Sequence, residues 1–205
     1  MRAAVLGSPI AHSLSPVLHL AAYRALGLAD WDYEKHLCTE PKLAGFDGGG
    51  RAVVLGAGGT AQAALPALCE LGIEEIEVLV RSLGRTEELQ ATADRIGVAP
   101  TISDALVDPE RASAALADAD VVISTLPGAA ADPLRGAGPK TVLLDVIYAP
   151  WPTPFAAAAA AGARVCSGLE VLLQQAAGQV ELMTGCPGPV SQMRAALDAA
   201  VAARG

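Results

Sequence analysis

Residues 51–61 read Arg51-Ala-Val-Val-Leu-Gly-Ala-Gly-Gly-Thr-Ala61. The apolar run from Ala52 to Leu55 predicts a short buried strand, and the run from Gln62 to Leu71 predicts a helix. Between them lies the pattern Gly56-x-Gly58-x-x-Ala61, a dinucleotide-binding fingerprint in the strand–turn–helix context that it requires. The alternative is a tight turn of the kind found in any α/β protein, and the context favours the fingerprint.

Each small residue of this pattern has a physical role. Gly56 permits the tight turn after the strand, and Gly58 lets the backbone approach a pyrophosphate. Ala61 stands in place of a third glycine and still allows helix and strand to pack closely. Free N–H groups at the start of the helix, together with the helix dipole, would face the phosphates.

Strands alternate with helices across residues 51–184, which predicts an α/β fold with a doubly wound parallel sheet and right-handed crossovers. Further strands are expected near residues 76–80, 98–102, 121–125, 141–147 and 164–166, and the helices between them include one that begins at Thr153-Pro154. Residues 3–6 and 31–37 predict two strands that flank a helix running to about Leu26, with Pro16 in its first turn and Ser15 as its N-cap. Another helix is expected over residues 39–46.

The expected strand at Ile76–Val80 is followed by Arg81, and Arg85 lies four residues further on. An acidic residue at this place binds the ribose 2′-hydroxyl of NAD, whereas an arginine favours the 2′-phosphate of NADP. No acid lies at the strand end, so the sequence favours NADP over NAD. The alternative is that both are ordinary solvated surface arginines.

The composition excludes several classes of partner. The chain of 205 residues carries a net charge of −8, which makes a nucleic-acid partner unlikely on electrostatic grounds. The four cysteines have no C-x-x-C or Cys/His spacing, so we expect a reduced cytoplasmic protein without a metal site, and His12 and His19 as loop and helix residues. No apolar run reaches membrane-spanning length.

Six segments of the chain form a recognisable set in a fixed order. They are Gly7-Ser-Pro-Ile-Ala-His-Ser-Leu-Ser-Pro16, Gly56-Ala-Gly-Gly-Thr60, Val80-Arg-Ser-Leu-Gly-Arg85, Ser124-Thr125, Asp145-Val-Ile-Tyr148 with Pro152-Thr-Pro154, and Gly168-Leu-Glu-Val-Leu-Leu-Gln-Gln175. Together they resemble the shikimate dehydrogenases, NADP-dependent enzymes that reduce 3-dehydroshikimate to shikimate. Two positions depart from the family pattern, because Val80 replaces an asparagine and Val171 replaces a methionine.

The resemblance implies roles for individual residues. The substrate-binding residues that it implies are Ser13, Ser15, Tyr148 and Gln175. The cofactor-binding residues that it implies are Gly56, Ala57, Gly58, Gly59, Thr60, Ala61, Arg81, Ser82, Arg85, Thr125, Val146 and Gly168. Simpler readings remain open for three of them, since Ser15 could be only a helix cap, Tyr148 a core aromatic and Gln175 a solvated helix residue.

One part of the family pattern is not matched. The family carries a proton-transfer lysine in an Asn-Val-Thr-x-Pro-x-Lys motif and an aspartate in an Asn-Thr-Asp-Gly motif, both before the fingerprint. Only residues 39–50 occupy that interval here, and neither Lys42 nor Asp47 has the motif around it. Either a segment is absent from the sequence, which we favour, or the gene product is shortened; we assign no catalytic residue.

We therefore expect a small N-terminal substrate domain, residues 1–46, a Rossmann domain, residues 47–185, and a C-terminal helix, residues 186–205. The implied function is an NADP-dependent shikimate dehydrogenase of aromatic amino-acid and chorismate biosynthesis, acting as a monomer or homodimer. The alternatives are a degenerate NADP-binding protein without turnover and a related dehydrogenase that acts on quinate.

Overall fold

The computed structural model describes residues 2–5, 14–28, 32–35 and 50–203. The chain forms two compact units, which we describe separately. Unit 1 comprises residues 1–41 and 170–205, and unit 2 comprises residues 42–169. The described residues include no helix that is both long enough and apolar enough to span a membrane.

Unit 2 contains a six-stranded sheet in which every pairing is parallel. Its strands are β3 (Arg51–Leu55), β4 (Glu75–Leu79), β5 (Thr101–Ser103), β6 (Val121–Ser124), β7 (Val142–Asp145) and β8 (Arg164–Ser167). Its α-helices are α2 (Gly59–Glu70), α3 (Glu87–Ile96), α4 (Pro109–Leu116) and α5 (Pro154–Ala159), with short 3-10 turns η1 (Leu83–Arg85), η2 (Ala105–Val107) and η3 (Gly128–Ala131). The predicted α/β class and parallel sheet are confirmed.

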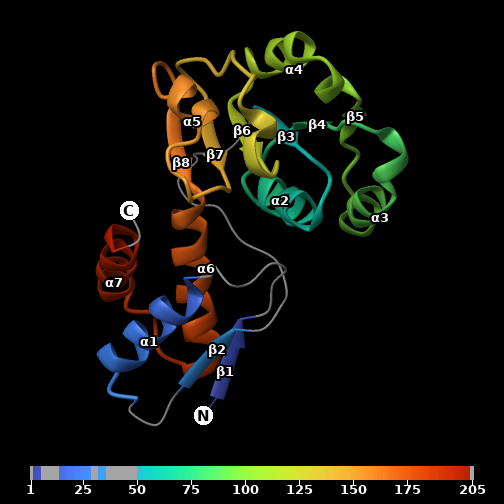
Figure 1. The fold of residues 1–205 in the computed structure, drawn as a ribbon. Helices are drawn as coiled ribbons and strands as arrows, with labels where there is room; N and C mark the ends of the chain where they lie inside the picture. Colours follow the sequence, from blue (N-terminus) through green and yellow to red (C-terminus); the bar gives the residue numbers. More distant parts are fainter. Residues whose placement is uncertain (1, 6–13, 29–31, 36–49, 204–205) are drawn as a thin grey trace. The chain divides into compact units, whose positions relative to one another are not determined.

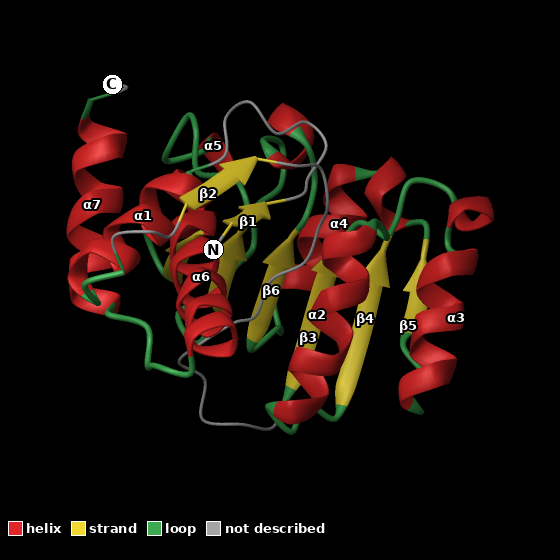
Figure 2. Cartoon of the chain, turned by 90° about the horizontal axis from the view of Figure 1, so that it is seen from below, coloured by secondary structure: helices red, strands yellow, loops and turns green. Residues whose placement is uncertain are grey.

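The strand order is β5-β4-β3-β6-β7-β8, so the chain changes direction across the sheet between β3 and β6. Figure 2 shows the arrows of β3, β4, β5 and β6 pointing the same way. In doubly wound sheets a dinucleotide binds beyond the carboxyl ends of the strands at this switch point. The fold therefore places the loops after β3, β4, β6 and β7 where a cofactor would lie.

The sheet is covered on both faces, as a parallel sheet requires. Figure 1 shows α2 and α3 on one side of it and α4 and α5 on the other. Alternate strand residues such as Val53, Leu55 and Val122 are fully buried in a cluster that also contains Leu116 of α4 and Phe155 of α5. This apolar core holds the strand ends that carry the site.

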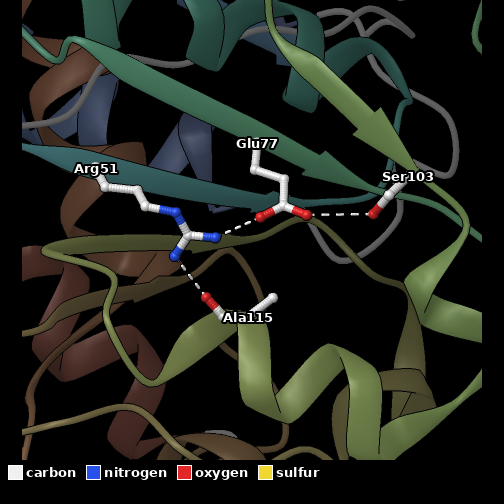
Figure 3. A network of polar contacts seen from close by, with 4 residues as sticks. All are labelled: Arg51, Glu77, Ser103 and Ala115. Carbon is white, nitrogen blue, oxygen red and sulfur yellow. Dashed lines mark hydrogen bonds and ion pairs between the residues drawn. The ribbon is translucent and has the colours of Figure 1, made fainter.

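A polar network lies against α4 (Figure 3). The Arg51 guanidinium donates to the Glu77 carboxylate and, at 2.7 Å, to the carbonyl oxygen of Ala115. The other Glu77 oxygen accepts a hydrogen bond of 3.3 Å from the Ser103 hydroxyl. Asp120 accepts from the backbone N–H of Arg51 at 2.9 Å. The network ties β3, β4, β5 and α4 together, and none of its members lines the pocket described below.

Unit 1 is smaller, and its described residues form a sheet of two strands. Its elements are β1 (Arg2–Val5), β2 (Asp32–Lys35), α1 (Ser15–Ala25), most of α6 (Gly168–Thr184) and α7 (Val190–Ala202). β1 and β2 are parallel, α1 contacts α7, and the buried side chains include Leu18, Tyr23 and Leu197. The Tyr23 hydroxyl donates to the Met183 sulfur at 3.7 Å.

Three details differ from the sequence-based expectations or are not tested by the structure. Ser15 is the first residue of α1 and Leu14 precedes it as the cap, so the prediction of Ser15 as N-cap is wrong by one position. The helix expected over residues 39–46 lies outside the described residues. The compact units meet at residues 169 and 170, and the domain boundaries expected at residues 46 and 185 stay a prediction; within unit 1, Arg194 of α7 pairs with Glu170, and Gly188 packs closely on Ala177 of α6.

Candidate cofactor-binding site

The turn after β3 requires glycine at its first position. Gly56 has a φ of 103°, and a Cβ atom built on it would lie 2.6 Å from the Thr125 hydroxyl oxygen. That hydroxyl donates to the Leu55 carbonyl at 2.8 Å, so the loops after β3 and β6 are held against each other. An L-residue at position 56 would meet both backbone strain and a steric clash.

Gly58 differs from Gly56 in a way that points to a ligand. It caps α2 with φ −73°, and a Cβ built on it would meet nothing within 4 Å. Among the residues that the structure describes, no side chain caps α2, so its first N–H groups are available to an anion. Ala61 is fully buried, which agrees with the predicted role in close helix packing.

A cavity of about 710 Å³ opens beside this turn. It is lined by Gly56, Ala57, Gly58, Val80, Arg81, Ser82, Arg85, Glu88, Leu106 and Pro127. The structure thus brings the glycine turn after β3 and the arginine loop after β4 into one pocket, and their role in cofactor binding stays a prediction. The predicted residues Gly59 and Thr60 lie at the start of α2 beside this lining.

Arg81 and Arg85 are both exposed. Within the described part of the chain neither guanidinium has a hydrogen-bond or ion-pair partner, whereas Arg51, Arg111 and Arg194 are paired with acids. Two free guanidiniums beside a glycine turn and a helix N-terminus form a pocket suited to a molecule with several phosphates.

Besides Val80, which precedes Arg81, three residues that line the pocket were not among the predicted cofactor residues. Glu88 lies in the first turn of α3 and accepts a hydrogen bond of 3.4 Å from Gln62 of α2. Leu106 is brought to the pocket by η2, where its N–H donates to the Val80 carbonyl at 3.2 Å. Pro127 follows β6. Glu88 could have been predicted, because it lies three residues after Arg85. The positions of Leu106 and Pro127 in the pocket depend on how the chain returns to the sheet.

The remaining predicted cofactor residues lie beyond the ends of β6, β7 and β8. Thr125 is half-buried and engaged with Leu55, as described above. Val146 follows β7, and Gly168 is the first residue of α6. A Cβ built on Gly168 would overlap the carbonyl oxygen of Val146, so these two residues are in direct contact through their backbones.

The predicted substrate residues are distributed over both units. Ser15 is buried in α1 and Gln175 is half-buried in α6, both in unit 1, whereas Tyr148 is half-buried in unit 2. Ser13, Lys42 and Asp47 lie outside the described residues, as does His12. The described ranges contain no group of three His, Cys, Asp or Glu side chains that could hold a metal ion.

His19 is fully buried in α1, as an internal helix residue. Its Nδ1 lies 2.9 Å from the Ser15 carbonyl, and Gln179 of α6 provides a further hydrogen bond. Burial lowers the pKa of His19 to about 4, against the opposing effect of these hydrogen bonds. The ring is therefore neutral at physiological pH, and it joins α1 to α6.

Fold and pocket together define a dinucleotide-binding Rossmann domain linked to a second, smaller unit. Comparisons with known proteins specify the family. Residues 168–197 match the family described as the shikimate 5'-dehydrogenase C-terminal domain. The chain is similar to a crystal structure of Mycobacterium tuberculosis shikimate dehydrogenase, with 37% sequence identity and a TM-score of 0.78, covering 97% of this chain and 98% of that one. The chain belongs to the shikimate dehydrogenase family.

Curated relatives add information about length. A shikimate dehydrogenase (NADP(+)) of Geobacter sulfurreducens is 33% identical over 160 residues, which cover 75% of this chain and 56% of the relative. The chain thus matches little more than half the length of the first curated relatives. One from Desulfitobacterium hafniense is 29% identical over 274 positions, covering 97% of this chain and 98% of the relative. Since this chain has 205 residues, at least 69 of those 274 positions face gaps in it.

Proposed function

We propose that this chain binds NADP(H) in the pocket of unit 2. The observation that carries the proposal is a pair of guanidiniums, Arg81 and Arg85, that have no partner within the described ranges and lie in one cavity with Gly56 and Gly58. Arginines at the end of the second Rossmann strand suit a 2′-phosphate, and the N–H groups at the start of α2 suit a pyrophosphate. The names of the curated relatives support this choice of cofactor.

The proposed reaction is the reversible reduction of 3-dehydroshikimate to shikimate. NADPH, when bound, supplies a hydride. The chain's own part is to hold the cofactor with the residues beyond β3, β4, β6 and β7, and to bind the substrate through Ser13, Ser15, Tyr148 and Gln175. This would place the protein in chorismate and aromatic amino-acid biosynthesis, in the cytoplasm, as a monomer or homodimer.

A second function is favoured by a specific observation. The family's lysine and aspartate motifs are not matched, and the Desulfitobacterium hafniense relative aligns with long gaps in this chain. A positioned proton donor typically contributes about 10²–10⁴-fold to rate. A protein of these 205 residues would then bind NADP(H) without turnover. A quinate-type activity would require the same absent groups.

Two measurements on one preparation test the proposal. Calorimetric titration with NADP+ and NAD+ tests cofactor binding, and NADPH absorbance with shikimate tests turnover. NADP+ binding that is clearly tighter than NAD+ binding supports the cofactor site, whereas equal affinities would contradict it. Turnover decides between the dehydrogenase and the binding protein without turnover.

A further inference from the structure

The loop after β7 lies where the second half of a dinucleotide would bind. Strands β6, β7 and β8 form the second half of the doubly wound sheet, and each half of such a sheet holds one mononucleotide. The arginine pocket belongs to the first half, next to β4. The loop of residues 146–153 includes Val146 and Tyr148, so its backbone position matters at the nicotinamide end of the proposed site.

Asp145, the last residue of β7, joins the two ends of this loop. Its side chain is 1% exposed. One carboxylate oxygen accepts a hydrogen bond of 2.7 Å from the Thr153 hydroxyl, and the other accepts one of 3.2 Å from the Ile147 N–H. Both oxygens are thus bonded within the segment that follows the strand.

Thr153 has two roles at once. Its hydroxyl donates to Asp145 and accepts from the Ala156 N–H at 3.1 Å, which caps α5. The loop therefore ends on a helix start that is itself tied to Asp145. At the other end of the loop, the Gly168 backbone lies directly against Val146, as described above, and the Gly168 N–H donates to the Ile147 carbonyl at 3.5 Å.

Burial of the Asp145 carboxylate costs free energy, because its charge is removed from water. Burial raises the pKa of Asp145, and the Thr153 and Ile147 hydrogen bonds oppose that shift. A buried charged group is retained at low cost only where hydrogen bonds occupy its oxygens. In this loop the Ile147 bond holds the backbone that follows Val146, next to Gly168, and the Thr153 bond holds the other end of the loop.

We propose that Asp145 is a positioning residue for the nicotinamide half of the cofactor site, because its hydrogen bonds to the Ile147 N–H and to the Thr153 hydroxyl hold both ends of the loop of residues 146–153, beside Gly168. The proposal rests on the proposed NADP(H) function. It predicts that loss of the bonds made by Asp145 weakens binding of the whole dinucleotide and leaves binding of its adenine half unchanged.

The test compares NADP+ with 2′,5′-ADP, which has the 2′-phosphate and no nicotinamide. The variant Asp145→Asn removes one acceptor, since an amide nitrogen cannot accept the Thr153 proton. We expect NADP+ affinity to fall about tenfold, as for loss of one charge-assisted hydrogen bond, with 2′,5′-ADP affinity within about twofold of wild type. Thr153→Val should give the same pattern and Thr153→Ser should restore wild-type binding.

The matched control is Asp108→Asn, because Asp108 accepts from the N–H groups of Glu110 and Arg111 at the start of α4 and does not line the pocket. It should leave both affinities unchanged. If Asp145→Asn fails to fold, the NADP+ and 2′,5′-ADP affinities of Thr153→Val and Thr153→Ser test the proposal instead. Equal weakening of both ligands, or no change in either, would overturn the positioning role. Failure of the wild-type chain to bind either ligand would instead overturn the proposed function, and this proposal with it.

Discussion

The two units differ in how much of a site each contains. Unit 2 has a six-stranded sheet and, in one cavity, a glycine turn and two arginines that have no partner among the described residues. The described part of unit 1 pairs two strands, and the family's proton-transfer motifs are not matched in the sequence. The residues proposed to bind the cofactor and the family's proton-transfer motifs therefore belong to different parts of the sequence, so one set can be present where the other is not matched.

The largest effect expected from this comparison is on turnover. A binding protein without turnover should bind NADP+ and show no detectable NADPH formation with shikimate, since a missing proton-transfer group alone costs about 10²–10⁴-fold and lost substrate geometry costs more, whereas the dehydrogenase should form NADPH. Absorbance of NADPH measures this, with the Desulfitobacterium hafniense relative as positive control. Robust turnover would mean that Lys42 or another group performs the proton transfer.

The next prediction compares alanine substitutions at two glycines of unit 2. Gly56→Ala should destabilise the protein by about 4 kcal/mol, because a positive φ and an overpacked contact with Thr125 each cost about 1–3 kcal/mol. Gly58→Ala should leave stability within about 1 kcal/mol, yet weaken NADP+ binding, because its Cβ would occupy space open to the ligand. Urea unfolding and titration measure the two quantities. Equal effects of both variants on stability would contradict the assigned roles.

A pH-dependent effect is expected in unit 1. The pKa of buried His19 falls from 6.5 to about 4, so the folded state disfavours the protonated ring. The neutral ring of His19 contributes fully to the free energy of unfolding above pH ~6.5, and this contribution is lost as the pH falls toward ~4. At pH ~4.5 the lost free energy of unfolding amounts to about 2–3 kcal/mol. Urea unfolding of wild type and His19→Gln at pH ~7.5 and ~4.5 measures this. A loss of stability with pH that is the same in both proteins would exclude His19 as its source.

The smallest effect concerns cofactor choice. Arg81→Ala should weaken NADP+ binding by about 1.5–3 kcal/mol and leave NAD+ binding nearly unchanged, because only NADP+ offers a 2′-phosphate. The control is Arg111→Ala, an exposed arginine of unit 2 that is paired with Asp104 at 3.1 Å and lies outside the pocket. If both variants weaken NADP+ equally, general charge rather than a specific contact is responsible.

Local sequence patterns predicted those parts of the site that depend on neighbouring residues. The glycine turn, the arginine loop and the Thr153 cap follow from backbone freedom, spacing and capping preference, and the pocket and cap geometry agree with them. Leu106 and Pro127 could not be predicted, because their place in the pocket depends on long-range crossovers. The hydrogen bond from Thr153 to Asp145 likewise requires knowing how the loop folds back on β7.

The central claim is that unit 2 forms a site with a preference for NADP(H). The most direct measurement is calorimetric titration of the whole chain with NADP+ and with NAD+ under identical conditions. We expect one site per chain that binds NADP+ at least about tenfold tighter than NAD+, since each contact to the 2′-phosphate is worth about 1.5–3 kcal/mol. Equal affinity for the two cofactors, or no binding of NADP+, would contradict it.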